Sequence, residues 1–173
     1  RLNYEEKAVK NFVFFNDGNE KLDKLKRIGS TGGIYTCKPD SFNYILKVMG
    51  LMMRRGSGGD IPENNIEALL KGMRLCKNFD EIVMIADNNA AVRDMILLEK
   101  VKLPPVRIVL CGVNRCQPIH PHYLEIARRT GGSIHTIEED ITNLSKAREG
   151  QTIDILGINY IIKKGKLVRS KYS

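Results

Sequence analysis

The sequence predicts an α/β fold in which a doubly wound, mostly parallel sheet is followed by a small β-meander. Two observations support this prediction. Apolar strand patterns alternate with helical patterns through most of the 173 residues, which is typical of a parallel sheet with helices on both faces. From Gln151 the pattern changes to short strands separated by glycine turns. We therefore expect an α/β domain over residues 1–148 and an appended meander over residues 151–173.

Composition sets limits on this fold and its partners. A hydrophobic content of 42% is enough for a core at this length. No apolar run approaches the roughly 20 residues of a membrane span. The net charge of +8 leaves nucleic-acid binding open, but a solvated basic face is favoured, because no aromatic-plus-basic motif or zinc-finger spacing accompanies it. The excess cations gather in two clusters: Lys21, Lys24, Lys26 and Arg27, and Lys163, Lys164, Lys166, Arg169 and Lys171.

The four cysteines do not form a metal-binding pattern. Cys37, Cys76 and Cys111 lie in apolar surroundings, which favours buried thiols. Cys111 and Cys116 are five residues apart, so a loop disulfide stays open. No C-x-x-C pair exists, and no second cluster completes a zinc site.

The first quarter of the chain predicts two strands and a helix. The run Asn11–Phe15 is a strand that ends at the turn residues Asn16 and Asp17. A charged surface turn or short helix follows over residues 20–27, and Ile34–Cys37 is expected to pair with the first strand as an antiparallel edge. Residues 40–55 predict a helix with its methionines in the core.

A glycine-rich loop over residues 56–65 organises the rest of the chain. It connects the helix that ends near Arg55 with a second helix predicted over residues 62–76. Pro62 suits a first helical turn, Asp60 is a capping residue, and Glu63 lies near the positive end of the helix dipole. The same two carboxylates offer oxygen ligands for Mg²⁺ or Ca²⁺. On the loop alone, capping is the favoured interpretation.

The next segments predict a parallel sheet. Residues 81–87 form a continuous apolar run, typical of a central strand covered on both faces. This strand ends at Asp87 and Asn88, where open α/β sheets place ligands, although an Asx turn explains an acid there equally well. Further elements are expected as helices over 92–98, 121–130 and 140–147 and as strands over 106–113 and 133–136. His120 and His122 flank Pro121 at a predicted helix start, which we favour over a metal site.

These loops predict a shared acidic edge. The carboxyl ends of parallel strands meet at one edge of a sheet, so the acids are expected to converge and to need a cation or donors between them. The expected metal ligands are Glu63, Asp87 and Asp60. The residues expected to shape the loops are Gly58, Gly59, Pro62, Asn16, Asp17 and Asn88.

The order of these elements resembles a von Willebrand factor A-like domain, a Rossmann-like sheet whose upper edge carries a metal-ion-dependent adhesion site. The resemblance covers roughly residues 11–148. It is carried by the strand ending at Asp17, the Gly-Gly-Asp-x-Pro-Glu loop of residues 58–63, the strand ending at Asp87, and the Ala-x-x-Thr-Gly-Gly turn of residues 127–132. It implies that a partner carboxylate completes the coordination of Mg²⁺, or of Mn²⁺ or Ca²⁺.

The chain departs from this family at the first metal motif. The Asp-x-Ser-x-Ser sequence is absent, and Leu2–Ala8 does not resemble the central strand that carries it. We therefore expect that residues upstream of Arg1 supply this strand or that a neighbour fills its place. Without the serine hydroxyls, metal affinity in this chain is expected to be weak or absent.

The resemblance implies a non-enzymatic protein-interaction domain whose adhesion site is degenerate or incomplete. A protein partner is therefore expected. Two alternatives remain at the sequence level. One is a nucleic-acid-associated protein that uses its basic tail, and the other is a metal-dependent α/β enzyme.

Overall fold

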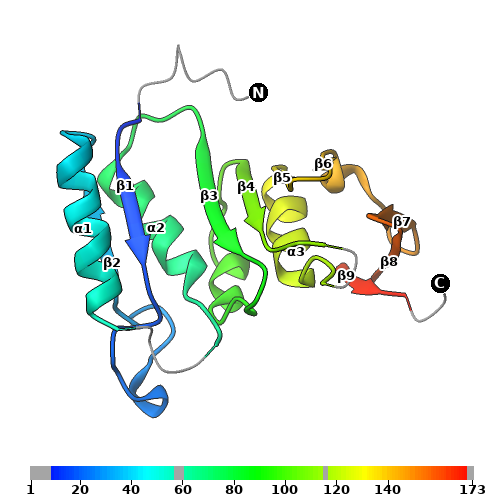
Figure 1. Ribbon diagram of the computed structural model, residues 1–173. Helices are drawn as coiled ribbons and strands as arrows, with labels where there is room; N and C mark the ends of the chain where they lie inside the picture. The colour runs from blue at the N-terminus through cyan, green and yellow to red at the C-terminus, as the bar shows by residue number, and fades with distance from the viewer. Residues whose placement is uncertain (1–8, 57–60, 115–116, 171–173) are drawn as a thin grey trace. The chain divides into compact units, whose positions relative to one another are not determined.

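The computed structural model describes residues 9–56, 61–114 and 117–170. Gly58, Gly59, Asp60, Cys116, Lys171 and Leu2–Ala8 lie outside them. The chain divides into two compact units, residues 1–79 and 80–173. Figure 1 labels the elements of both units, which are described one at a time.

The first unit is built on a two-stranded antiparallel sheet. Strand β1 (Phe12–Phe15) pairs with β2 (Ile34–Cys37), with Phe12 opposite Cys37 and Phe15 opposite Ile34. A short 3₁₀ helix, η1 (Asp23–Leu25), lies between the strands in sequence. Helices α1 (Phe42–Arg54) and α2 (Asn65–Leu75) both pack against the strand pair (Figure 1). The predicted antiparallel edge pair is therefore confirmed.

The two helices of this unit begin in different ways. Ser41 caps α1, because its hydroxyl oxygen accepts a hydrogen bond from the Tyr44 amide at 3.2 Å. The second helix begins at Asn65 with Asn64 at its N-cap position. The expected helix start at Pro62, with Asp60 as its cap and Glu63 in its first turn, is therefore wrong. The Asn64 side chain donates to Gly32 O at 2.9 Å instead of capping the helix.

The second unit contains the parallel strands. Strands β3 (Ile82–Asp87), β4 (Val106–Cys111) and β5 (Ser133–His135) are parallel in that order, and β6 (Asp140–Ile141) pairs antiparallel with β5. Helix α3 (Pro121–Thr130) packs against β4 and β5. The α/β class is thus observed, with parallel strands confined to β3, β4 and β5 among the described residues. A doubly wound sheet stays a proposal.

Two predicted helices of this unit are wrong. Residues 92–98 form only a 3₁₀ helix over Met95–Glu99 (η2). Residues 140–147 split into β6 and a second 3₁₀ helix over Leu144–Lys146 (η3), because Asp140 pairs with His135 and Asn143 takes a left-handed φ of 62°. A left-handed residue ends a helical run, so the acids before Asp140 do not start a helix there.

Strand β3 differs from the expected central strand. It stands at the edge of its sheet, with β4 as its one partner among the described residues. Met84 is buried, whereas Val83 is 44% exposed and Ile85 is 67% exposed. Alternate side chains of a strand point to opposite faces, so one face of β3 is covered and the other is open.

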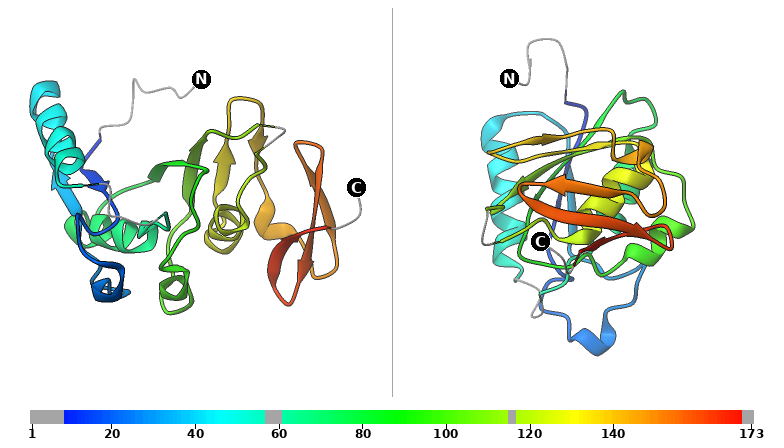
Figure 2. Two further views of the ribbon diagram at one scale, coloured as in Figure 1. Left: turned by 60° about the horizontal axis from the view of Figure 1, so that its bottom comes forward. Right: turned by 90° about the vertical axis from the view of Figure 1, so that its right-hand side faces the viewer.

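The meander predicted after Gln151 is confirmed. Strands β7 (Thr152–Ile155), β8 (Ile158–Lys163) and β9 (Lys166–Arg169) form a three-stranded antiparallel sheet, which Figure 2 draws in orange to red. Both of its turns have two consecutive residues with positive φ, Leu156–Gly157 and Lys164–Gly165, as two-residue hairpins require. The Tyr160 hydroxyl donates to Ile119 O at 2.9 Å, which joins the meander to the segment that precedes α3.

None of the helices in the described ranges is long and apolar enough to cross a lipid bilayer.

The close approach of α3 to β4 generates a stability prediction at Gly132. A Cβ added there would overlap the Val106 carbonyl and stand 2.7 Å from Val106 N. We therefore expect Gly132→Ala to destabilise the second unit by about 1–3 kcal/mol, as overpacking does. Denaturant unfolding measures the change. The matched control is Gly131→Asn: Gly131 has φ 72° and open space around its Cβ position, so asparagine is tolerated there. Equal losses in the two variants would contradict the packing argument.

Candidate metal-binding loops

Three loops carry the expected site residues. The loop after β1 and the loop before α2 belong to the first unit, and the loop after β3 belongs to the second unit. Glu63 and Asp87 therefore belong to different units, and each is described in its own surroundings.

Asn16 holds the loop after β1 in place. Its Oδ1 accepts the Asn19 amide hydrogen at 2.8 Å, and its Nδ2 donates to Met52 O at 3.1 Å. Its backbone amide donates to Gly33 O at 2.9 Å. Gly33 has φ 68°, and a Cβ there would overlap Asn16 Oδ1, so the close approach requires glycine. Asn16 thus shapes this loop.

Asp17 is fully buried and forms an ion pair with Lys26. The Lys26 side chain is itself only 1% exposed and also contacts Asp23 Oδ1 at 2.8 Å. A buried carboxylate needs a compensating charge, and Lys26 supplies it inside the protein. The sequence analysis placed Lys26 among the surface cations, so its partner was missed.

Glu67, in the first turn of α2, is the second buried carboxylate of this unit. Its two oxygens accept the Gly29 amide at 2.7 Å, the Thr31 amide at 2.9 Å and the Thr31 hydroxyl at 2.8 Å. The Glu67 carboxylate therefore fixes the loop that leads into β2 to the start of α2. The sequence analysis missed this residue, although an acid in the first turn of a helix is the available signal.

The segment before α2 places polar groups close to the start of that helix. Glu63 is half-buried and lies two residues before the helix begins, next to Asn64. Asn64 is fully buried, and its Oδ1 accepts no hydrogen bond from any described residue. A buried acceptor oxygen needs a donor, an ordered water or a cation. The buried Asn64 oxygen beside Glu63 is therefore an available ligand atom.

Asp87 and Asn88 end β3 in the second unit. The Asp87 side chain is exposed, and its Oδ1 accepts the Asn89 amide hydrogen at 3.0 Å, which is an Asx turn. Asn88 is buried, and its Oδ1 accepts the His120 amide hydrogen at 2.8 Å while its Nδ2 donates to Pro118 O at 2.8 Å. Asn88 thus fixes the loop before α3 to the end of β3, directly beside Asp87.

The two histidines stabilise the start of α3. The Nδ1 atom of His120 accepts the His122 amide hydrogen at 3.2 Å, and Nδ1 of His122 accepts the Val92 amide hydrogen at 3.1 Å. Pro121 stands in the first turn. Both rings accept through Nδ1, which is possible only when that atom is unprotonated. Burial lowers the pKa of both rings, and each has a cation or histidine neighbour that lowers it further. The predicted helix-start role is confirmed.

The cysteines match their expected burial only in part. Cys37 is buried, and this burial raises the pKa of its thiol. Cys76 is half-buried, and Cys111 is exposed, because it ends β4 on the face opposite to Val106 and Ile108. The expectation of a buried Cys111 is therefore wrong.

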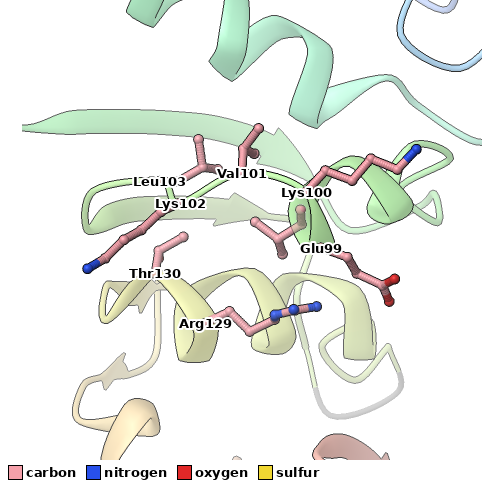
Figure 3. Close-up of a pocket in the computed structure, with 8 residues that line it drawn as sticks. Glu99, Lys100, Val101, Lys102, Leu103, Arg129 and Thr130 are labelled. Carbon is pink, nitrogen blue, oxygen red and sulfur yellow. The ribbon is translucent and has the colours of Figure 1, made fainter.

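No group of three or more His, Cys, Asp or Glu side chains suited to a metal ion occurs within residues 9–56, 61–114 and 117–170. Asp60, the third expected ligand, lies outside these ranges. A hollow of about 350 Å³ in the second unit is lined by Lys100, Lys102, Arg129 and Glu99, among others. Lys100 and Lys102 point to opposite sides of it (Figure 3), so its cations do not converge on one point.

Comparison with known proteins found no matching family model, no matching curated protein and no matching solved structure.

The contacts of Glu67 predict a loss of stability when its carboxylate is removed. In Glu67→Ala the amides of Gly29 and Thr31 lose their acceptor. An unsatisfied buried donor costs about 1–3 kcal/mol, so the first unit should lose at least that amount in denaturant unfolding. The matched control is Glu67→Gln, which keeps one acceptor oxygen and should lose less. If both variants unfold like the parent chain, these hydrogen bonds do not hold the loop.

The histidines predict a loss of stability in mild acid. Their pKa values are lower in the folded protein than the ordinary 6.5, so below that pH the unfolded chain binds protons that the folded chain does not. The contribution of the two histidines to the free energy of unfolding should be constant above about pH 6.5. Below that pH the free energy of unfolding should decrease as the pH decreases.

Denaturant unfolding between pH 7.5 and 5.5 measures this effect. The double variant His120→Asn/His122→Asn keeps acceptor oxygens but cannot titrate, so the acid-dependent loss should shrink. An unchanged pH dependence in the double variant would contradict the assignment to these two rings.

Proposed function

We propose that the chain is a non-enzymatic protein-interaction domain of the von Willebrand factor A-like type. The single observation that carries the proposal is the pair of open strand edges. Among the described residues β1 pairs only with β2, and β3 pairs only with β4. A sheet of this family without its central strand would present two such edges, and the Asp-x-Ser-x-Ser motif of that strand does not occur in residues 1–173.

The parallel strands support the same proposal. The order β3–β4–β5 with α3 packed on β4 and β5 is the strand–helix–strand arrangement expected of the second half of such a doubly wound sheet. Asp87 stands at the carboxyl end of β3, where sheets of this kind bind ligands. In the first unit, α2 follows β1 and β2 and packs on both.

The donor set suits a hard divalent cation. Glu63 and Asp60 in the first unit, and Asp87 in the second, would each offer carboxylate oxygens, and Mg²⁺, Mn²⁺ and Ca²⁺ prefer oxygen ligands. Asn64 adds a buried amide oxygen that no described residue occupies. Asn88 would hold the segment around Asp87 in place. The bound ion would present an open position to an acidic side chain of a partner protein.

This proposal predicts weak, metal-specific heat of binding. Mg²⁺, Mn²⁺ and Ca²⁺ titrated into the chain should give dissociation constants no tighter than roughly millimolar, because the affinity for a hard cation decreases when few charged ligands are available. Glu63→Ala and Asp87→Ala should each remove the heat. Isothermal titration calorimetry checks this, with Glu99→Ala as the matched control, since Glu99 lines a separate hollow.

Three results would count against the metal part of the proposal. They are equal heats in all variants, loss of heat only in Glu99→Ala, and no heat in the parent chain up to tens of millimolar metal. The last result would leave the domain as a scaffold that binds protein without an ion.

A further inference from the structure

Helix α1 exposes five large apolar or aromatic side chains, and three of them lie along one line; Tyr44 and Leu51 lie on the opposite side. Phe42 is 74% exposed, Met53 is 66% exposed and Leu46 is 40% exposed. Residues four and seven apart lie on one side of a helix, so these three form a single stripe, called the α1 stripe below. Its ends, Phe42 and Met53, are 11 positions apart, which is about 16 Å at the helical rise of 1.5 Å per residue. The prediction that the methionines of this helix fill the core is wrong for Met53.

The other side of α1 is also apolar. Ile45, Val48 and Met52 are half-buried, and this helix contacts β1 and β2. No residue of α1 is fully buried. The apolar surface of α1 is therefore wider than the side that contacts β1 and β2, and large exposed apolar surfaces mark sites of interaction. The packing in the first unit covers only one side of α1.

Cations line one edge of the α1 stripe. Lys47 and Arg54 are exposed and lie about 100° around the helix from the stripe, and Arg55 follows at the C-terminal end. The helix contains no acid. None of these three cations has an ion-pair partner among the described residues, whose ion pairs involve other side chains. Their charge is therefore available to a partner.

Gly50 lies between the stripe and the cations. A glycine within a helix costs roughly 0.5–1 kcal/mol relative to alanine, so its presence needs a reason. The first unit supplies none: Gly50 has ordinary helical φ, and an added Cβ would meet only the movable Arg54 Nη1, at 3.3 Å. A missing side chain at this point lets another helix approach closely.

We propose that α1 is a docking site for an amphipathic helix of a partner protein, one with acids along the side that meets Lys47 and Arg54. The apolar stripe would bury the apolar face of that helix, as in other helix-recognition surfaces, and the cations would set its orientation. A second copy of α1 would bring the same unpaired cations together, and a lipid surface would gain nothing from Gly50. This site is independent of the metal-dependent function proposed above.

A displayed library of 18-residue helical peptides tests the proposal. Each peptide carries leucines at positions i, i+4, i+7 and i+11, and the flanking positions vary among Glu, Gln and Lys. Selection against the full chain is carried out in EDTA, so that the metal proposal does not enter. Four chains are compared: the parent, Phe42→Ser/Met53→Ser, Lys47→Glu/Arg54→Glu, and the control Leu22→Ser/Leu25→Ser. The control removes two leucines of the same unit that are 61% and 56% exposed.

The proposal expects peptides rich in Glu on one flank to be selected by the parent chain and by the control. Phe42→Ser/Met53→Ser should weaken binding of the best peptide at least 10-fold, and Lys47→Glu/Arg54→Glu should shift the selected flank to Lys. Gly50→Leu should weaken binding without loss of helicity in circular dichroism, whereas Gly50→Ala should raise the unfolding midpoint.

Four results would overturn it. The first is that the parent chain enriches no peptide relative to Phe42→Ser/Met53→Ser, and the second is enrichment that does not depend on the charge of the flanking positions. The third is a parent chain that sediments as a dimer, with Phe42→Ser/Met53→Ser sedimenting as a monomer. The fourth is binding of the chain to phosphatidylglycerol vesicles that is unchanged in Gly50→Leu. Circular dichroism of every variant separates loss of binding from loss of fold.

Discussion

The first unit depends on one buried carboxylate. Glu67 accepts three hydrogen bonds from the segment that leads into β2, and it does so from the first turn of α2. A helix N-terminus stabilises a negative charge, so the fold places an acid where its burial costs least. Asn64, one turn earlier, adds a hydrogen bond to Gly32. Together these contacts hold α2, and with it the Glu63 segment, against the loop before β2.

In the second unit, neutral side chains rather than a buried carboxylate join the loops by hydrogen bonds. Asn88 uses both ends of its amide to join the end of β3 to the segment before α3, and two unprotonated imidazoles accept backbone amides at the same place. A side-chain amide can donate and accept hydrogen bonds at once, so it joins two backbone segments without burying a charge. The end of β3 is therefore joined by hydrogen bonds to the segment before α3, while the Asp87 carboxylate itself is exposed to solvent.

The sequence predicted elements well where local and tertiary forces agree. The strand at residues 12–15, the helix that begins after Ser41 and the glycine turns of the meander have clear periodicity or turn chemistry. The sequence failed to predict the structure where contacts with residues distant in the chain determine it. The acids around Asp140 suggested a helix start, but pairing of Asp140 with His135 made a strand. Lys26 has no local signal for burial, and the helix-start position of Glu67 does not reveal its partner, because Asp17 and Thr31 are identified as the partners only in three dimensions. The alternation of covered and exposed side chains along β3 could not be predicted, because almost every residue of this strand is apolar.

The two interpretations of Asp87, a turn former and a metal ligand, do not exclude each other. Its Oδ1 accepts the Asn89 amide, and its Oδ2 has no hydrogen bond to any described residue. A carboxylate has about four lone-pair sites, so one oxygen can fix the side chain while the other coordinates an ion. Fixing the side chain in advance removes part of the entropy that binding would otherwise cost. The Asx turn is thus a reason to expect the Asp87 carboxylate to be well ordered before any ion binds to it.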